Sequence, residues 1–251
     1  MQIRLLGPIE VVTGDRQVDL GPRKQRALLC VLALNANRVV TTDRILEELW
    51  GDDAAGKENA LWVAISRLRS ALEPARDGHG GSAVLLTRDH GYVLNVDPGQ
   101  IDVTQFEALV AETRRLLHQD PASAVDRIDV ALSLWRGAPM EEFQHQEFVQ
   151  LATAALHELR VEALELRAEA QLRLGRGREQ ISALEALHQQ HPLRERFVDL
   201  LMRSLYQAGR QADALRAFDR HRRFIADELG ISPTPELNRL EEQILLHDTS
   251  L

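Results

Sequence analysis

One face of the segment 58–73 carries side chains that could recognise the edges of DNA bases. The sequence ENALWVAISRLRSALE places leucine or isoleucine at i, i+4, i+7 and i+11, which makes one apolar stripe of an α-helix, namely Leu61, Ile65, Leu68 and Leu72. The opposite face carries Asn59, Val63, Ser66, Arg67 and Ser70, with Trp62 and Arg69 at one edge. Amides and hydroxyls bond base edges, small apolar groups contact thymine methyls, and arginine pairs with guanine or phosphate. The pattern fits either an ordinary solvated helix face or a face that enters a DNA groove.

A second candidate for chemistry is a phosphate-binding loop at 51–58. GDDAAGKE supplies the pattern G-x-x-x-x-G-K, but the motif also needs a preceding strand and a hydroxyl residue after the lysine. The preceding RILEELW has a helical pattern, and Glu58 stands where the hydroxyl residue belongs. The two acids Asp52 and Asp53 would repel phosphate. We therefore interpret this segment as a connector that can contact protein, without a nucleotide.

The remaining reactive residue types do not form a catalytic or metal site. His188 and His191 share a predicted helix end, but no cysteine or carboxylate cluster completes a metal set, so the histidines are interpreted as solvated or capping. Cys30 lies in the apolar run ALLCVLAL, which predicts a buried, inert thiol. The basic run 216–224 is interpreted as a solvated face, with a secondary DNA or partner contact as the alternative. We expect no cofactor, no metal and no enzymatic activity.

The elements around the 58–73 helix predict how it is positioned. Short strands are expected in the first twenty residues, then helices over 24–34, from Thr41 or Thr42 to about 50, and over 59–72, and then a hairpin within 83–96. Three helices followed by a hairpin make a winged helix-turn-helix, with the third helix as recognition helix and the hairpin as wing. In that layout DNA phosphates are within reach of Lys24, Arg38, Arg69, Thr87, Arg88 and His90.

After residue 99 the pattern changes to long helices, predicted over 102–119, 121–136 and 146–174. Gly175-Arg176 is answered 34 residues later by Gly209-Arg210, and this period is typical of tetratricopeptide repeats. One apolar face is predicted from Leu193, Phe197, Leu200, Leu201 and Leu205, and another from Leu215, Phe218 and Ile225. The predicted fold is mainly α with a small β part: a winged helix domain over 1–97 and an all-α tetratricopeptide-like domain over 98–251.

The charge of the chain is unevenly distributed. The net charge is −8 over 251 residues. Residues 1–97 hold 12 Lys and Arg against 13 Asp and Glu, a balance of −1, and the rest hold 18 against 25, a balance of −7. A near-neutral first domain can still bind DNA if its cations share one face. Because the sequence shows neither a long apolar run nor a secretory signal, we expect a cytoplasmic protein.

Several segments resemble a known family. LGPRKQRALLCVLAL, VVTTDRILEELWG, ALWVAISRLRSALE and LLTRDHGYVLNV resemble the OmpR-type winged helix of the Streptomyces antibiotic regulatory protein (SARP) family. IDVTQFEALV, ALSLWRGAPMEEF, HPLRERFVDLLMRSLYQAGRQADALRAF and ELGISPTPELNRLEEQIL resemble its bacterial transcriptional activation domain. The order and spacing of these segments extend the resemblance over nearly the whole chain.

The resemblance implies a transcriptional activator that binds direct repeats near promoters as a side-by-side homodimer and recruits RNA polymerase. It implies DNA contacts from the 59–72 helix, with Arg67 and Arg69 at the family's basic positions, and a polymerase contact from Asp52, Asp53 and Lys57. Trp62 and Ala64 depart from the polar residues expected there, so the target sequence is expected to differ. Two alternatives stay open: a helical-repeat scaffold for protein interactions, and the N-terminal regulatory part of a larger nucleotide-hydrolysing signalling protein.

Overall fold

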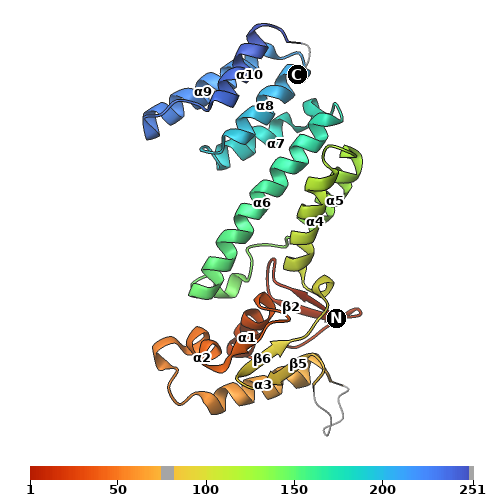
Figure 1. The fold of residues 1–251 in the computed structure, drawn as a ribbon, viewed down its shortest axis with the longest axis vertical. Helices are drawn as coiled ribbons and strands as arrows, with labels where there is room; N and C mark the ends of the chain where they lie inside the picture. Colours follow the sequence, from red (N-terminus) through yellow and green to blue (C-terminus); the bar gives the residue numbers. More distant parts are fainter. Residues whose placement is uncertain (75–81, 249–251) are drawn as a thin grey trace. The chain divides into compact units, whose positions relative to one another are not determined.

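The computed structural model describes residues 1–74 and 82–248. The chain forms two compact units (Figure 1). The first unit combines Met1–Leu109 with Ala131–Leu159, and the second combines Val110–Val130 with Arg160–Leu251. The described residues are mainly helical with a small β part, which confirms the predicted fold class.

The first unit opens with a winged helix-turn-helix. Its elements in chain order are β1 (Gln2–Arg4), β2 (Glu10–Thr13), β3 (Arg16–Gln17), α1 (Arg23–Leu34), β4 (Val40–Thr41), α2 (Thr42–Trp50), the 3-10 turn η1 (Gly51–Asp53), α3 (Glu58–Leu72), β5 (Leu85–Arg88) and β6 (Gly91–Leu94). β1, β2 and β3 form one antiparallel sheet, and β4, β6 and β5 form a second in that order. The predicted order of strands, three helices and a hairpin is confirmed.

Local chemistry fixes the start of α2 and the register of the second sheet. The Thr41 side chain accepts a hydrogen bond from the Arg44 amide at 3.3 Å, so Thr41, rather than Thr42, is the N-cap of α2. Gly91 pairs with Thr41 across β4 and β6. A Cβ at position 91 would lie 2.0 Å from the Val40 carbonyl oxygen, so the two strands can approach this closely because residue 91 is glycine.

The apolar stripe of α3 packs into the core of the first unit. Leu61, Ile65, Leu68 and Leu72 are all buried, as the helical spacing predicted. They face α1, whose residues from Ala27 to Ala33 are buried and include Cys30. Cys30 is buried, as predicted, and burial strongly raises the pKa of its thiol, which disfavours the reactive thiolate.

Longer helices follow the hairpin. They are α4 (Asp102–Leu116), α5 (Pro121–Ser133) and α6 (Glu147–Arg173), separated by the 3-10 turns η2 (Pro98–Gln100) before α4 and η3 (Glu141–Phe143) before α6. The predicted ranges 102–119 and 121–136 extend three residues too far, because turns follow Leu116 and Ser133. The first half of α6 belongs to the first compact unit and the second half to the other.

Polar contacts attach this segment to the winged helix within the first unit. The buried Asp102 carboxylate accepts hydrogen bonds from the Leu5 amide at 2.7 Å and the Leu6 amide at 2.9 Å. The Arg26 guanidinium binds the Glu142 carboxylate through Nε at 2.8 Å and through a terminal nitrogen at 2.6 Å. These pairs join the end of β1 to α4, and α1 to η3.

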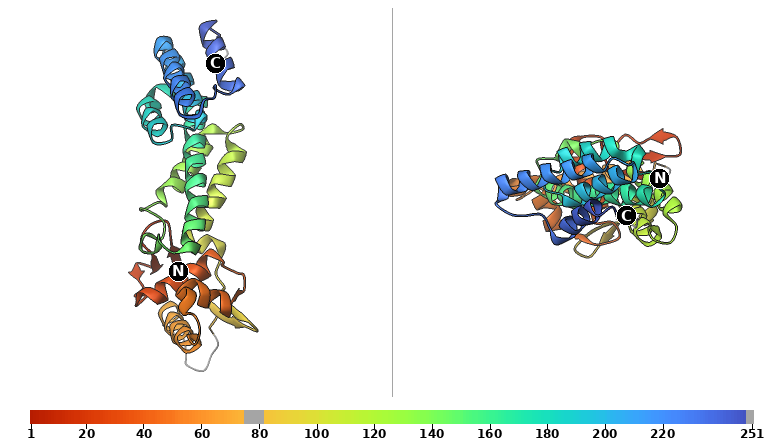
Figure 2. Two further views of the ribbon diagram at one scale, coloured as in Figure 1. Left: turned by 90° about the vertical axis from the view of Figure 1, so that its left-hand side faces the viewer. Right: turned by 90° about the horizontal axis from the view of Figure 1, so that it is seen from above.

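The second unit stacks helices in pairs. α7 (Gly177–Gln190), α8 (Glu195–Gln207), α9 (Gln211–Leu229) and α10 (Pro235–Leu245) pack on their neighbours, as Figures 1 and 2 show. Gly175 and Gly209, at φ 71° and 74°, take the same left-handed conformation before α7 and α9. These two glycines, 34 residues apart, thus occupy equivalent positions in successive turns. Phe197, Leu200 and Leu201 lie in the shared core.

Two predictions in this unit were wrong. Leu193 is 58% exposed, because it lies in the turn before α8 rather than on the apolar face of that helix. His221 is fully buried instead of solvated or capping, and neither of its ring nitrogens has a hydrogen-bond partner among the described residues. It lies against His188, with ring centroids 5.5 Å apart, and burial together with His221 lowers the pKa of His188.

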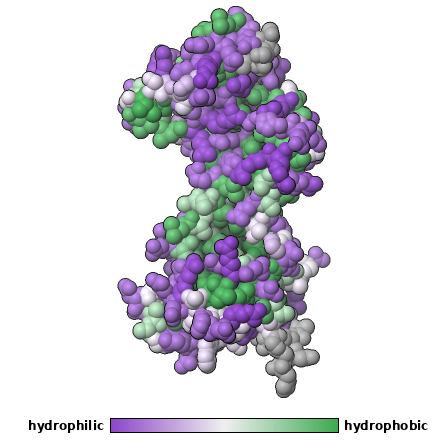
Figure 3. Space-filling view, viewed as in Figure 1, coloured by the Kyte–Doolittle hydropathy of each residue, from purple (hydrophilic) through white to green (hydrophobic). Residues whose placement is uncertain are grey.

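On the face drawn in Figure 3, apolar side chains gather at the surface in several patches between polar ones. Among residues 1–74 and 82–248, no helix is long and apolar enough to cross a bilayer.

Candidate nucleic-acid interface

The back of α3 is an exposed face made of the predicted recognition residues. Asn59, Trp62, Val63, Ser66, Arg67 and Ser70 are all exposed on this helix. The indole of Trp62 and the side chain of Val63 are 66% and 49% exposed, which is unusual for large apolar residues. The buried stripe on the opposite face packs α3 against α1. The position of the exposed side chains is therefore fixed by the core.

Most polar groups on this face are available to a ligand. The side chains of Asn59, Ser66 and Arg67 make no hydrogen bond or ion pair with any residue in the described ranges. Ser70 is partly engaged, since its hydroxyl donates to the Ser66 carbonyl oxygen at 3.2 Å. An amide, a hydroxyl and a guanidinium on one helix face match the groups that bond base edges in the major groove.

Arg69 links α3 to the hairpin. Its Nε donates to the Leu85 carbonyl oxygen at 2.9 Å, and a terminal nitrogen donates to Thr87 Oγ1 at 2.8 Å. Its guanidinium carbon lies 6.0 Å from the centre of the Tyr92 ring. The sequence suggested a phosphate contact for Arg69 and Thr87. The structure shows that both side chains also hold the wing against α3, a pairing that no local pattern reveals.

Lys24 has a structural partner as well. Its ammonium donates a hydrogen bond to the Leu49 carbonyl oxygen at the end of α2 and lies 5.2 Å from the centre of the Trp50 ring. Partial burial, followed by the nearby charge of Arg23, lowers its pKa. The ammonium thus satisfies a carbonyl that the helix leaves unpaired. Lys24 is not among the residues that line the hollow between α3 and the wing.

A hollow of about 460 Å³ lies on the surface between α3 and the wing. Its walls bring together five of the predicted contact residues, namely Trp62, Ser66, Arg69, Thr87 and Arg88. Thr42, Asp89 and Tyr92 also line it and were not predicted. Tyr92 could have been predicted, because it lies opposite Thr87 in the register of the hairpin. Arg38, before β4, and His90, in the hairpin turn, are exposed but do not line the hollow.

The connector between α2 and α3 is an exposed acidic turn. Asp52 and Asp53 are exposed, and Lys57 is half-buried at the start of α3. A helix precedes the connector, as predicted, so it lacks the strand that a phosphate-binding loop requires. Within the described part of the chain, no three His, Cys, Asp or Glu side chains are placed to hold a metal ion.

Comparisons with known proteins match both parts of the chain. Residues 15–94 match the family model described as transcriptional regulatory protein, C terminal. Residues 101–245 match the model described as bacterial transcriptional activator domain.

Curated relatives match over the whole chain. It is 34% identical to the transcriptional regulator RedD of Streptomyces coelicolor, covering 100% of this chain and 72% of RedD. It is 33% identical to the regulatory protein AfsR of Streptomyces griseus, covering 100% of this chain but 25% of AfsR. These relatives are transcriptional regulators, a class distinct from enzymes.

A solved structure has the same architecture. It is Mycobacterium tuberculosis EmbR in complex with a low-affinity phosphopeptide, with a TM-score of 0.90 and 33% identity. The match covers 98% of this chain and 65% of that one. The chain thus spans about two thirds of the solved EmbR and about a quarter of AfsR.

Proposed function

This chain belongs to the SARP family of transcriptional regulators, and we propose that it activates promoters by placing α3 in the major groove of direct DNA repeats. The observation that supports this most strongly is the exposed back of α3. It combines Asn59, Ser66 and Arg67, whose side chains are unengaged, with the exposed apolar surface of Trp62 and Val63.

The dimensions of α3 suit this role. Fifteen residues span about 22 Å at 1.5 Å per residue, and the major groove admits one helix. Arg67 would donate to a guanine, Asn59 and Ser66 would bond base edges, and Trp62 and Val63 would contact thymine methyls. The wing residues Thr87, Arg88 and His90, together with Arg38, would lie on the flanking phosphates and set the register without reading the sequence.

Two copies are proposed to act side by side. Each would occupy one repeat, with repeats one helical turn apart, about 10 bp. We assign residues 1–97 to DNA binding and 98–251 to activation and dimer support. The turn with Asp52, Asp53 and Lys57, which links α2 to α3, would contact RNA polymerase, as the resemblance to the family implies. The protein would act in the bacterial cytoplasm, on chromosomal DNA.

Selection of bound duplexes from a random DNA pool tests the proposal. Wild type should enrich a motif repeated at one-turn spacing. Arg67→Ala should weaken binding to that motif by roughly 1–3 kcal/mol, with loss of preference at one base position. Arg178→Ala is the matched control, since Arg178 is an exposed arginine on α7.

The other outcomes separate the alternatives. Equal weakening of Arg67→Ala on all sequences, with a shallower dependence on salt, would make Arg67 a phosphate contact rather than a base contact. If no motif emerges at moderate salt, α3 is not a base-reading helix. The stacked helices α7–α10 would then be the working part, as a scaffold for protein partners.

A further inference from the structure

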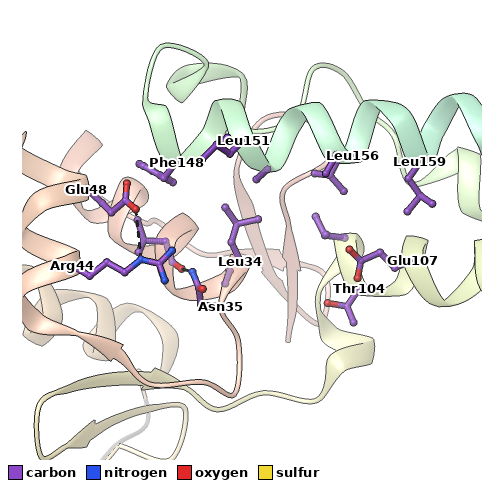
Figure 4. Close-up of a pocket in the computed structure, with 15 residues that line it drawn as sticks. Leu34, Asn35, Arg44, Glu48, Thr104, Glu107, Phe148, Leu151, Leu156 and Leu159 are labelled. Carbon is purple, nitrogen blue, oxygen red and sulfur yellow. Dashed lines mark hydrogen bonds and ion pairs between the residues drawn. The ribbon is translucent and has the colours of Figure 1, made fainter.

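The first unit contains a second hollow that DNA recognition leaves unexplained. It is a pocket of about 560 Å³. The end of α1 and the start of α4 form one side of it, and the first half of α6 forms the opposite side (Figure 4). We call it the α6 pocket. Its volume lies in the range of sites that bind small molecules, about 300–1,000 Å³. All of its lining residues belong to one compact unit.

The side of the α6 pocket that α6 forms is an uncovered apolar stripe. Phe148, Leu151, Ala152, Ala155 and Leu159 follow one another at helical spacing on α6 and face the hollow, together with the buried Leu156. Leu151 is 73% exposed, although it is a large aliphatic side chain. From Phe148 to Leu159 the stripe runs about 16 Å. Leu34 rises toward it from the end of α1, as Figure 4 shows.

Charged groups stand at the two ends of this apolar stripe. At the Phe148 end, Arg44 and Glu48 of α2 form an ion pair with 3.6 Å between Nε and Oε1. At the other end, Glu107 of α4 lies beside Thr104 and opposite Leu156 and Leu159. Glu107 has no ion-pair or hydrogen-bond partner for its side chain among the described residues. The three ionised side chains that line the pocket therefore have a net charge of −1.

No cation among the described residues neutralises the charge of the Glu107 carboxylate. Much of the side chain is exposed, yet its surroundings in the pocket are apolar enough that desolvation raises the pKa of its carboxyl. A carboxylate beside leucines gains from a cation that enters the same apolar surroundings, because the attraction is stronger there than in water.

We propose that the α6 pocket binds an elongated, largely apolar small molecule that carries one basic amine, with the amine paired to Glu107. The apolar body lies along Phe148, Leu151 and Leu156. Because the walls come from α1 and α2 of the winged helix and from α6, an occupant would touch the DNA-binding part and the long helix at once. This site is separate from the hollow between α3 and the wing, and the proposal does not depend on DNA recognition.

Pyrene probes of three charges test the proposal in the absence of DNA. The full chain is titrated with pyrenylmethylamine, pyrenylmethanol and pyrenecarboxylate, and fluorescence anisotropy reports binding. Wild type should bind the amine about tenfold more tightly than the alcohol, and the carboxylate more weakly than both. Glu107→Gln should remove the advantage of the amine and leave binding of the alcohol unchanged. Glu112→Gln, on the same helix but outside the pocket, should behave as wild type.

A pair of filling variants locates the site. Ala152→Phe places a ring in the pocket and should abolish binding of both amine and alcohol. Ala154→Phe adds the same ring on the exposed side of α6 and should change neither. Circular dichroism confirms that each variant is folded.

Three results would overturn the proposal. One is the absence of saturable binding by any probe, and another is equal binding of amine and alcohol with no effect of Glu107→Gln. The third comes from sedimentation of wild type and of Leu151→Arg. If wild type is a dimer that Leu151→Arg dissociates, and the amine is not bound selectively, a second copy of the chain covers the stripe instead.

Discussion

Gly91→Ala should disrupt the attachment of the wing. The Cβ of an alanine would lie 2.0 Å from the Val40 carbonyl oxygen, 2.8 Å from the Val40 carbonyl carbon and 2.9 Å from the Thr41 Cα. All three atoms belong to the backbone, so no side-chain rotation relieves the overlap. An ordinary contact to a Cβ is about 3.4 Å or more, so β4 must move away from β6 by more than 1 Å.

The expected loss follows from the hydrogen bonds near this contact. β4 pairs with β6 at Val40 and Thr41, and the Thr42 amide also donates to the His90 carbonyl oxygen at 2.9 Å. Losing two to four such bonds, at about 1 kcal/mol each, should lower the free energy of unfolding of the first unit by about 2–4 kcal/mol.

Tryptophan fluorescence during urea unfolding measures this effect selectively. The chain has three tryptophans, Trp50, Trp62 and Trp135, and all lie in the first unit. Gly137→Ala is the matched control, because a Cβ there meets nothing closer than 3.8 Å. It should shift stability by less than about 0.5 kcal/mol. If Gly91→Ala unfolds at the same urea concentration as Gly137→Ala, the close approach of β4 and β6 does not constrain the wing.

Two further substitutions probe single side chains. Arg69→Ala removes the bonds to Leu85 and Thr87 and should destabilise the first unit by about 1–3 kcal/mol in the same fluorescence assay; unchanged stability would mean that α3 and the wing hold together without it. In the second unit, the hydrogen bond from Arg114 holds the pKa of Glu162 below its ordinary value. That stabilisation is present above about pH 4.5 and is lost as the pH falls through the lowered pKa. Glu162→Gln should therefore make the thermal midpoint, followed by circular dichroism, less dependent on pH between about 5 and 3; an unchanged acid dependence would contradict the pairing.

Periodic features were predictable because they depend on local geometry alone. The spacing of Leu61, Ile65, Leu68 and Leu72 fixes which face of α3 is buried whatever it packs on, so the exposed face was found with it. The 34-residue period was equally visible, since Gly175 and Gly209 both need the left-handed conformation. The same reasoning does not extend beyond the helix ends, which is why Leu193 was placed on a face that begins only with α8.

Partners of long charged side chains were not predictable. Arg69 and Lys24 looked like phosphate contacts, but each bonds a carbonyl oxygen that folding brings within reach. The Arg26–Glu142 pair joins residues 116 positions apart, and the burial of His221 depends on how α7, α8 and α9 stack. Such contacts depend on tertiary packing, so the local sequence pattern does not predict them.

These intramolecular contacts bear on how the proposed DNA complex would gain its affinity. Phosphate neutralisation supplies most of the sequence-independent binding, and each contact needs a cation that faces the duplex. Residues 1–97 have a net charge of −1, and the ammonium of Lys24 already bonds Leu49. Among the arginines proposed to contact phosphates, Arg38 and Arg88 are exposed. Because this balance is close to neutral, a single copy would hold the backbone weakly, and base contacts from α3 would carry a larger share. A second copy on the adjacent repeat would then supply the missing affinity, because each bound subunit raises the effective concentration of the other.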